Sequence, residues 1–436
     1  MTDDTFRRQP DQEEPAPEQP MLASEPDQAV APEPERGGRG GMRVLRALLL
    51  PVLAVFSAFV VGAIIIIFSD AQTLSLLGTD LGAAVGRAWS IVMQSYGALL
   101  SGSIGDPVRL LSALFAGDWV EVKRAFGPLS ETIVSATPLI FTGLSVALAF
   151  RVGLFNIGAE GQMYIGALIA IIAGFSFVGL PWFIHAPLAV LAGFIGGALW
   201  GFIPGLLKAR TGAHEVIVTI MLNFVAYRTV DYALKTAFVQ RPGRSDPISK
   251  VAEPGSWLMP IVEGLRAHWG IAIAVLAAVA VWWLLFRSRW GFEFRAVGLN
   301  PRAARYAGMS PGWSTVMSMV IAGGLAGLAG ASLMLGGSSK SLSPGFSPGY
   351  GFDGITVALV GATRPAGVVA AAFLFGALRA GATPMEAATG TPRDLVVVIQ
   401  ALVILFIAAP ALVRAIYRIR TQRTLGTEVF AKGWGS

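Results

Sequence analysis

Long runs of apolar residues recur along this chain, and their length predicts helices that cross a membrane. A helix needs about 20 mostly apolar residues to span a bilayer. Nine runs approach or exceed that length, and they lie at residues 44–69, 130–150, 154–175, 183–207, 214–238, 268–286, 311–336, 365–382 and 394–413.

Two further segments are less regular. Residues 82–104 are weakly apolar and interrupted by glycines, which favours an interfacial or partly inserted helix. Residues 351–365 are apolar but too short for a regular span, and such a segment is tolerated at membrane depth only inside the protein. We therefore expect an all-α fold, a polytopic membrane helical bundle of about 9–10 transmembrane helices, one of them short or broken.

Composition agrees with this pattern. Of the 436 residues, 54% are hydrophobic and only 14% are charged, whereas a soluble protein must cover its surface with charge. The absence of cysteine excludes disulfides, thiol nucleophiles and thiolate-bound metals. The three scattered histidines, His185, His214 and His268, supply no zinc-binding pattern, so we expect no metal site.

Charge divides the chain into three parts. Residues 1–36 hold ten acidic residues, three basic residues and seven prolines, a composition that cannot bury a core. We expect residues 1–42 to form a disordered, acidic cytoplasmic tail, residues 43–417 a transmembrane permease domain, and residues 418–436 a cytoplasmic C-terminal tail.

Basic residues also indicate which side of the membrane each loop occupies, because cytoplasmic loops are rich in lysine and arginine. The basic clusters contain Arg43 and Arg46, Lys208 and Arg210, five arginines between residues 287 and 305, and four between 414 and 423. All of them fall on one side if residues 351–365 cross the membrane as a tenth segment. Both termini are then cytoplasmic.

Polar residues interrupt the apolar stretch "RVGLFNIGAEGQMYIGALIA", residues 151–170. A carboxylate such as Glu160 costs about 2.5–3.5 kcal/mol at the centre of a membrane helix, so it should face water or a partner. Asn156 precedes a helical run and is expected to be its N-cap. We expect Asn156, Glu160 and Gln162 to line a substrate pathway. The alternative is internal pairing, for example of Glu160 with Arg151.

The stretch "TGAHEVIVTIMLNFVAY", residues 211–227, adds a fourth polar candidate. A helix is expected to begin at Thr211 or Gly212, with Glu215 in its first turn, where a carboxylate suits the helix dipole. Asn223 lies deeper in the same span and is a pathway candidate. For Glu215, a structural role in capping and hydrogen bonds between helices is at least as good an explanation as contact with the substrate.

The stretch "RAVGLNPRAARYAGMSP", residues 295–311, lies in a long basic loop. Asn300 as N-cap and Pro301 at the first helical position predict a short helix that ends near Gly308. Positive charge alone explains the arginines but not a capped helix with small residues, which suits docking of a second protein. The segment "GGSSKS", residues 336–341, lacks the spacing of a phosphate-binding loop, so any ATP dependence should come from a partner.

Four segments together resemble a known family. They are "GLFNIGAEGQMYIGA", "HEVIVTIMLN", "AVGLNPRAARYAGM" and "GYGFDGITVALVGATRPAGVVAAAFLFGAL". In this order they resemble the permease subunits of bacterial ABC importers of the branched-chain amino acid and simple-sugar group. The similarity runs over about residues 44–417 and is closest to the branch assigned to nucleoside and simple-sugar uptake. "GATRPAG" departs from relatives, which often have other polar residues before the proline, so the role of Arg364 stays open.

This resemblance implies an assembly in the bacterial inner (plasma) membrane. It contains two permease subunits, often non-identical, an ABC ATPase and an extracytoplasmic solute-binding lipoprotein. The chain itself would hold no cofactor, because ATP and Mg²⁺ bind the partner ATPase, and it would bind no nucleic acid. Residues 295–310 then correspond to the coupling helix that docks into the ATPase. Its docking face would consist of Asn300, Pro301, Ala303, Ala304 and Gly308.

Nucleosides are the expected cargo, because neutral, hydroxyl-rich solutes suit amides and exposed backbone. Phe155, Tyr164 and Phe224 could stack on a base, although aromatic residues more often serve packing. A simple sugar or a branched-chain amino acid is the alternative within the family. Outside it, an ion-coupled secondary transporter using Glu160 with Asp231 or Asp353, or a membrane scaffold, remains open.

Overall fold

The computed structural model describes residues 40–418. The chain is divided between Leu49 and Leu50 into two units, and residues 40–49 are the described part of the first. Of the predicted acidic tail, residues 1–39 lie outside the described part, whereas residues 40–42 begin a helix. Of the predicted C-terminal tail, only Arg418 is described.

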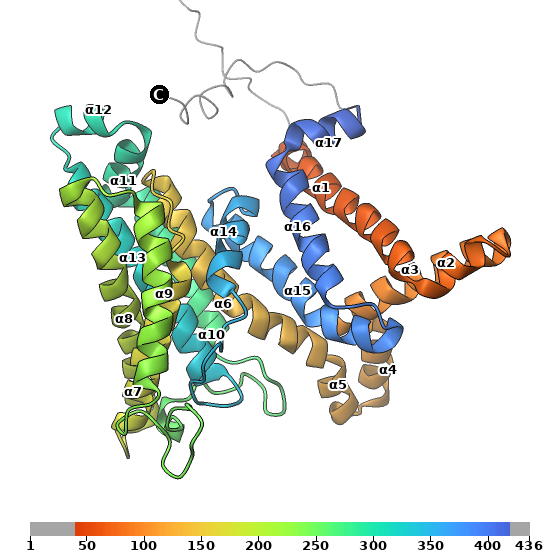
Figure 1. The fold of residues 1–436 in the computed structure, drawn as a ribbon, viewed down its shortest axis with the longest axis horizontal. Helices are drawn as coiled ribbons and strands as arrows, with labels where there is room; N and C mark the ends of the chain where they lie inside the picture. Colours follow the sequence, from red (N-terminus) through yellow and green to blue (C-terminus); the bar gives the residue numbers. More distant parts are fainter. Residues whose placement is uncertain (1–39, 419–436) are drawn as a thin grey trace, which may run out of the picture. The chain divides into compact units, whose positions relative to one another are not determined.

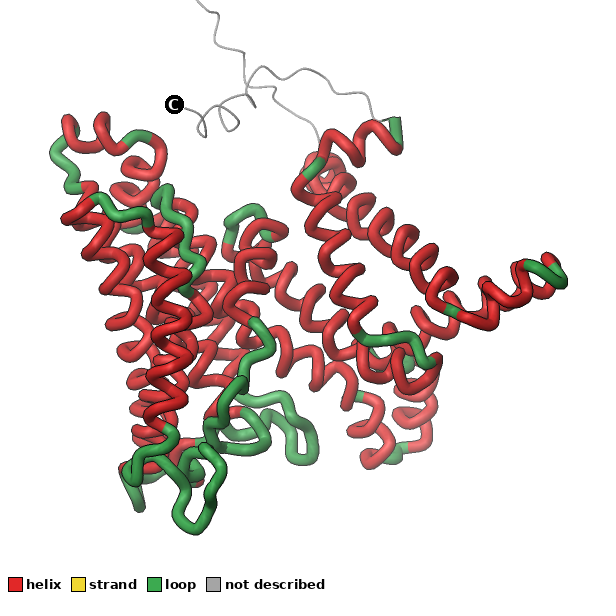
Figure 2. Tube along the Cα trace, in the orientation of Figure 1, coloured by secondary structure: helices red, strands yellow, loops and turns green. Residues whose placement is uncertain are grey.

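The described residues are folded as α-helices, one short 3-10 turn and connecting loops (Figures 1 and 2). The first six helices are α1 (Gly40–Ser69), α2 (Ala71–Leu77), α3 (Leu81–Ser103), α4 (Pro107–Ala116), α5 (Trp119–Ala125) and α6 (Gly127–Arg151). The next are α7 (Ala159–Ser176), α8 (Trp182–Thr211), α9 (Glu215–Ala233), the 3-10 turn η1 (Pro254–Ser256), α10 (Gly270–Arg287) and α11 (Arg289–Leu299). The last are α12 (Pro301–Tyr306), α13 (Pro311–Gly336), α14 (Tyr350–Val360), α15 (Pro365–Thr389), α16 (Asp394–Ala408) and α17 (Pro410–Ile416).

The predicted all-α membrane fold is confirmed. Eight helices among the described residues are long and apolar enough to span a bilayer: Leu49–Ser69 of α1 together with α6, α7, α8, α9, α10, α13 and α15. The predicted run 394–413 is not one straight helix, because the chain bends by 90° between α16 and α17. Pro410 explains this break, since proline cannot continue the hydrogen bonding of a preceding helix.

The other two irregular segments are also helical. Residues 81–103 form α3, which is not among the eight helices apolar enough to span a bilayer. The segment predicted to be short or broken forms α14, an apolar helix of only 11 residues. It packs mainly against α6, α15 and α7, whereas its residues Phe352 and Leu359 are exposed.

Helices α7, α8 and α13 pack closely against one another, and α6 lies against α13, α14 and α15 (Figure 1). Glycines allow the close approach of α8 and α13. A methyl group at Gly197 would overlap the backbone of Gly323 and Gly327. Small residues serve this purpose in membrane helices, where close van der Waals packing drives association.

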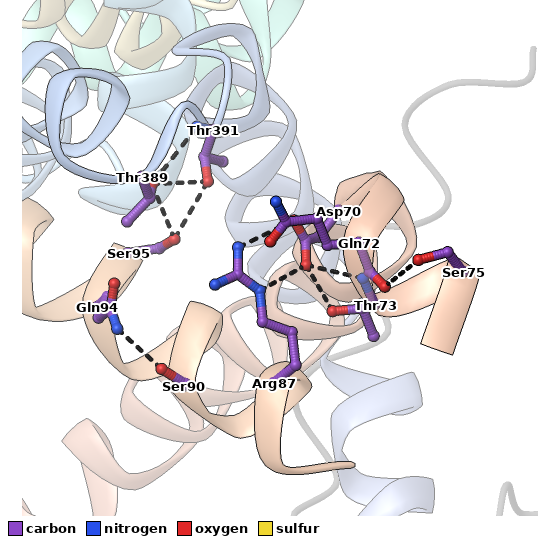
Figure 3. Close-up of polar contacts among 10 residues, drawn as sticks. All are labelled: Asp70, Gln72, Thr73, Ser75, Arg87, Ser90, Gln94, Ser95, Thr389 and Thr391. Carbon is purple, nitrogen blue, oxygen red and sulfur yellow. Dashed lines mark hydrogen bonds and ion pairs between the residues drawn. The ribbon is translucent and has the colours of Figure 1, made fainter. Parts of the chain in front are cut away.

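Polar contacts attach α2 and α3 to their neighbours (Figure 3). The Asp70 carboxylate accepts a hydrogen bond from the Thr73 N–H at 3.0 Å and caps α2. It also accepts one from Arg87 Nε at 3.1 Å, and this bond lowers the pKa of the carboxyl. Ser95 Oγ lies 3.2 Å from the hydroxyls of both Thr389 and Thr391, which joins α3 to the end of α15.

Candidate functional site

The entry to α7 is built on a buried pair of amides. Asn156 Nδ2 donates to Gln162 Oε1 at 2.9 Å, and Gln162 Nε2 donates back to Asn156 Oδ1 at 3.2 Å. The same Asn156 oxygen accepts the Gly158 N–H at 3.1 Å. The prediction that Asn156 is the N-cap is therefore wrong, because Gly158 is the N-cap and α7 begins at Ala159. Asn156 instead stabilises the turn that leads into the helix.

Glu160 is only 2% exposed, in the first turn of α7. Its Oε2 accepts a hydrogen bond from the Gly351 N–H at 2.5 Å, in the first turn of α14. Pairing of Glu160 with Arg151 is not observed. Arg151 Nε donates instead to the Thr363 carbonyl oxygen at 3.2 Å. The carboxylate thus joins the N-terminal ends of two helices, where the helix dipoles favour negative charge.

Asn223 connects α9 to the same place. Its Oδ1 accepts the Gly161 N–H at 2.8 Å, and its Nδ2 donates to the Ile157 carbonyl oxygen at 3.0 Å. A side chain at Gly161 would collide with Asn223, so the glycine is required for this approach. Both partners of the Asn223 side chain are therefore backbone groups of the protein itself.

The predicted start of α9 needs correction. Thr211 is the last residue of α8, and α9 begins at Glu215 with His214 as N-cap. Glu215 lies in the first turn as expected. It forms an ion pair with Lys208 at 2.9 Å, which provides a structural role for the carboxylate.

The four predicted pathway residues therefore meet in one place, which we call the polar array: Asn156, Glu160, Gln162 and Asn223. Each is at most 2% exposed, and their partners lie on α6, α7, α9, α14 and the turn before α7. In the isolated chain the polar array holds helix ends in register. That it also lines the substrate pathway stays a prediction.

Aromatic residues form a row beside the polar array. The Tyr164 ring centroid lies 4.6 Å from that of Tyr227 and 4.5 Å from that of Phe346, and Phe224 follows at 6.1 Å from Tyr227. We call these four residues the aromatic row. Tyr164 is buried against the core, whereas Phe224 is 59% exposed, so the row leads from the interior to an open face of α9. The sequence indicated Tyr164 and Phe224, but Tyr227 and Phe346 were missed because their proximity depends on tertiary contacts.

The open face of α9 also carries charge. Arg228 is exposed and pairs with Asp231 at 3.5 Å. An arginine on a spanning helix is costly in lipid, which favours a face directed at water, another subunit or the membrane surface. Phe155 does not join the aromatic row and packs against Phe150 at 5.0 Å.

The short helix predicted to follow Asn300 is present as α12. Asn300 Oδ1 accepts the N–H groups of Arg302 and Ala303, each at 3.0 Å, so the predicted N-cap is confirmed. Pro301 is the first helical residue, as expected. The helix ends at Tyr306, and Gly308 follows with φ +79° in the left-handed region.

One member of the predicted docking face points elsewhere. Ala304 is only 4% exposed and packs in the core, so its side chain forms no part of an accessible surface. Two apolar side chains that the sequence reading missed are accessible instead. Leu299 is 80% exposed and Tyr306 is 95% exposed. The sequence signal that could have indicated these two residues is the presence of large apolar side chains in a basic loop.

Comparison with known proteins identifies the family of this chain. Residues 129–408 match the family described as branched-chain amino acid transport system / permease component. This range includes the polar array, the aromatic row and α12. No solved structure matches the chain.

Several curated relatives are similar over most of their length. The guanosine ABC transporter permease protein of Bacillus subtilis is 44% identical, over 70% of this chain and 86% of the relative. A nucleoside ABC transporter permease protein of Lactococcus lactis is 37% identical, over 64% and 79%. A glucose ABC transporter permease protein of Haloferax volcanii is 36% identical, over 69% and 80%. The chain therefore belongs to the permease components of the branched-chain amino acid transport family.

Proposed function

We propose that this permease subunit forms part of the translocation pathway of an ATP-driven importer of nucleosides. The observation that supports this cargo best is the aromatic row, which extends from the polar array to the open face of α9. Aromatic faces stack on nucleobases, and base–aromatic stacking is sequence-tolerant and worth about 1–3 kcal/mol per base. Two relatives whose names specify guanosine and nucleoside transport add to this argument.

The polar array has a supporting role in this proposal. Its amides and carboxylate already bond to one another and to backbone, so they fix the positions of α7, α9 and α14. Small motions of α14 relative to α7 would uncover the Glu160 carboxylate, which accepts the Gly351 N–H. A carboxylate can accept hydrogen bonds from ribose hydroxyls or from the N–H groups of a base.

The importer would be completed by other chains. A second permease subunit, related but non-identical, would close the pathway, and an extracytoplasmic lipoprotein would deliver the solute. An ABC ATPase, which binds ATP and Mg²⁺, would dock on α12 from the cytoplasm, with both termini of this chain on the same side. Leu299 and Tyr306 then supply apolar contacts next to the predicted residues Asn300, Pro301, Ala303 and Gly308.

A sugar is the second candidate cargo, because one relative is named as a glucose permease. A sugar can also pack on an aromatic face, but it offers no flat base. The relatives are ABC permease proteins, which disfavours an ion-coupled transporter and a membrane scaffold.

The test is uptake by the complete transporter of radiolabelled guanosine, uridine, glucose and leucine, in a host that lacks its own carriers for them. We expect saturable, ATP-dependent uptake of a nucleoside, reduced at least tenfold by Tyr227→Leu. Phe183→Leu is the matched control, at an exposed aromatic residue on α8 outside the aromatic row. Uptake of glucose or leucine without nucleoside uptake would overturn the cargo and leave the permease function intact.

A further inference from the structure

We propose that Arg151, Arg295 and Arg364 form a binding site for a phosphate-bearing anion at the cytoplasmic end of α6. These residues come from α6, α11 and the residue just before α15. Neither the family match nor the predicted coupling surface assigns a role to this group, which we call the arginine cluster. Its placement on the cytoplasmic side rests on the proposed orientation.

Two fixed contacts bring the three residues together. Arg151 Nε donates to the Thr363 carbonyl oxygen at 3.2 Å, which places it next to Arg364. The guanidinium carbons of Arg151 and Arg295 lie 5.7 and 5.3 Å from the centroid of the same ring, Phe286. The charges of Arg295 and Arg364 are both close enough to act on Arg151.

The backbone holds this geometry. A methyl group at Gly298 would overlap the Arg151 carbonyl oxygen, so α11 lies directly against the end of α6. Arg295 is three residues earlier, on the same face of α11. On the other side, Ala362 and Thr363 have φ of 51° and 52°, an uncommon left-handed conformation for residues with side chains. This turn directs the Thr363 carbonyl oxygen at Arg151.

No carboxylate forms an ion pair with the arginine cluster within the part of the chain that the structure describes. Carboxylates pair with nine other basic side chains there, and none of them with Arg151, Arg295 or Arg364. Arg151 and Arg295 are half-buried, so water screens their repulsion less than at an open surface. A bound anion would remove this repulsion.

The start of α15 favours the same ligand. Arg364 is the N-cap of this 25-residue helix, and no side chain accepts a hydrogen bond from its first turn. Helix N-termini attract anions, phosphate among them. Arginine is also the side chain best suited to phosphate, because its planar guanidinium can donate two parallel hydrogen bonds.

Positive-inside charge is the simpler explanation of arginines in this loop, and α12 shows what that explanation produces. Arg302 and Arg305 are exposed, share no aromatic ring and lie near no uncapped helix. By contrast, Arg151 and Arg295 share the Phe286 ring, and Arg151 also donates to the carbonyl oxygen of Thr363, the residue before Arg364. The pair on α12 therefore provides a control that removes two positive charges, one more than Arg364→Gln or Arg151→Gln.

The phosphate could belong to an anionic phospholipid of the cytoplasmic leaflet or to a soluble anion. The experiment measures the thermal unfolding midpoint of the full chain in neutral detergent. Phosphatidylglycerol, phosphatidylcholine and inorganic pyrophosphate are added separately. We expect a rise with phosphatidylglycerol and none with phosphatidylcholine. A rise with pyrophosphate alone would assign the site to a soluble phosphate.

Variants connect the effect to the residues. Arg364→Gln, at an exposed position, and Arg151→Gln should each lower the apparent affinity for the effective anion at least fivefold. Arg302→Gln combined with Arg305→Gln should change it less than twofold. If neither anion raises the midpoint of the native chain, or if the control variant loses as much affinity as Arg364→Gln, the proposal is overturned. Because the readout is binding, it does not depend on the cargo.

Discussion

The carboxylate of Glu160 and the backbone N–H of Gly351 are joined by a 2.5 Å hydrogen bond across 191 residues of sequence. Gly351 has no alternative here, because a Cβ at this position would overlap the backbone of Glu160. The contact makes the start of α14 depend on the start of α7. A permease that alternates between two open states needs such places, where one short element can change partners.

Replacement of Glu160 should separate its structural role from its charge. Glu160→Ala leaves the buried Gly351 N–H without an acceptor, which costs about 1–3 kcal/mol. Glu160→Gln keeps an acceptor oxygen and should retain assembly while transport falls. The measurements are the unfolding midpoint in detergent and uptake by the assembled transporter. Glu131→Gln is the control, at an exposed ion pair with Arg266. Full uptake by Glu160→Gln would show that the negative charge of Glu160 is not needed for transport.

Asn223 should matter chiefly for the position of α9. Asn223→Ala removes the acceptor for the Gly161 N–H and the donor to the Ile157 carbonyl oxygen. We expect a loss of stability of about 2 kcal/mol, since two buried backbone groups lose their partners. Gln94→Ala, at an exposed amide on α3, should cost less than 0.5 kcal/mol. Equal unfolding midpoints for the two variants would contradict the structure of the polar array.

How far the sequence determines this picture can be judged from particular residues. Hydropathy is sufficient for the long helices, because the bilayer sets their length whatever their neighbours are. The N-cap at Asn300 was equally predictable, since a cap depends only on residues two or three positions away.

Long-range contacts could not be predicted in this way. Glu160 was recognised as needing a partner, but its partner is a backbone group 191 residues away, which no pattern of charges reveals. Ala304 was assigned to a surface because alanine is small, whereas its burial depends on how α12 lies on the bundle. Only Tyr164 and Phe224 of the aromatic row were predicted from the sequence. Phe346 comes from a loop, and its contact with Tyr164 depends on the tertiary fold.

The close packing of α8 on α13 predicts an asymmetric response to glycine substitution. Gly197→Ala places a methyl group against the backbone of Gly323 and Gly327, which must move apart. We expect a large fall in the unfolding midpoint or in folded yield. Gly86→Ala in α3 meets no atom within 4 Å and should be neutral or stabilising by up to about 1 kcal/mol, since alanine favours helix. Tolerance of Gly197→Ala would show that the two helices are not in direct contact.

The exposed side chain of Tyr306 allows a test of the coupling surface. Tyr306→Ala removes a 95% exposed ring, so the fold should be unaffected. If α12 docks in the ATPase, uptake should fall at least tenfold while the unfolding midpoint of the isolated chain changes by less than about 1 °C. Tyr232→Ala, at an exposed tyrosine on α9, is the control. Copurification of the ATPase with each variant measures docking directly, and equal recovery would remove Tyr306 from the interface.

The buried side chain of His268, just before α10, predicts that the stability of the protein depends on pH. Burial, assisted by the charges of Lys340 and Arg266, lowers the pKa of this imidazole to about 4. The neutral ring is also needed, because Nδ1 accepts the Gly270 N–H at 3.1 Å. In the unfolded chain the pKa returns to about 6.5, so between these values the unfolded state binds more protons. Stability contributed by His268 is therefore complete above pH 6.5 and falls as the pH drops towards 4.

The measurement is the unfolding midpoint between pH 4 and 8. His268→Gln, which cannot take up a proton, should flatten the decline below pH 6.5 although it lowers the midpoint at pH 7.5. His214→Gln, at an exposed histidine, should keep the slope of the native chain. A decline of equal steepness in the His268→Gln variant would show that the acid sensitivity comes from another group.

The His268 ring packs directly against Gly336 at the end of α13, so loss of its neutral form should also loosen that helix end. Faster hydrogen exchange at residues 333–337 below pH 6 would report this loosening.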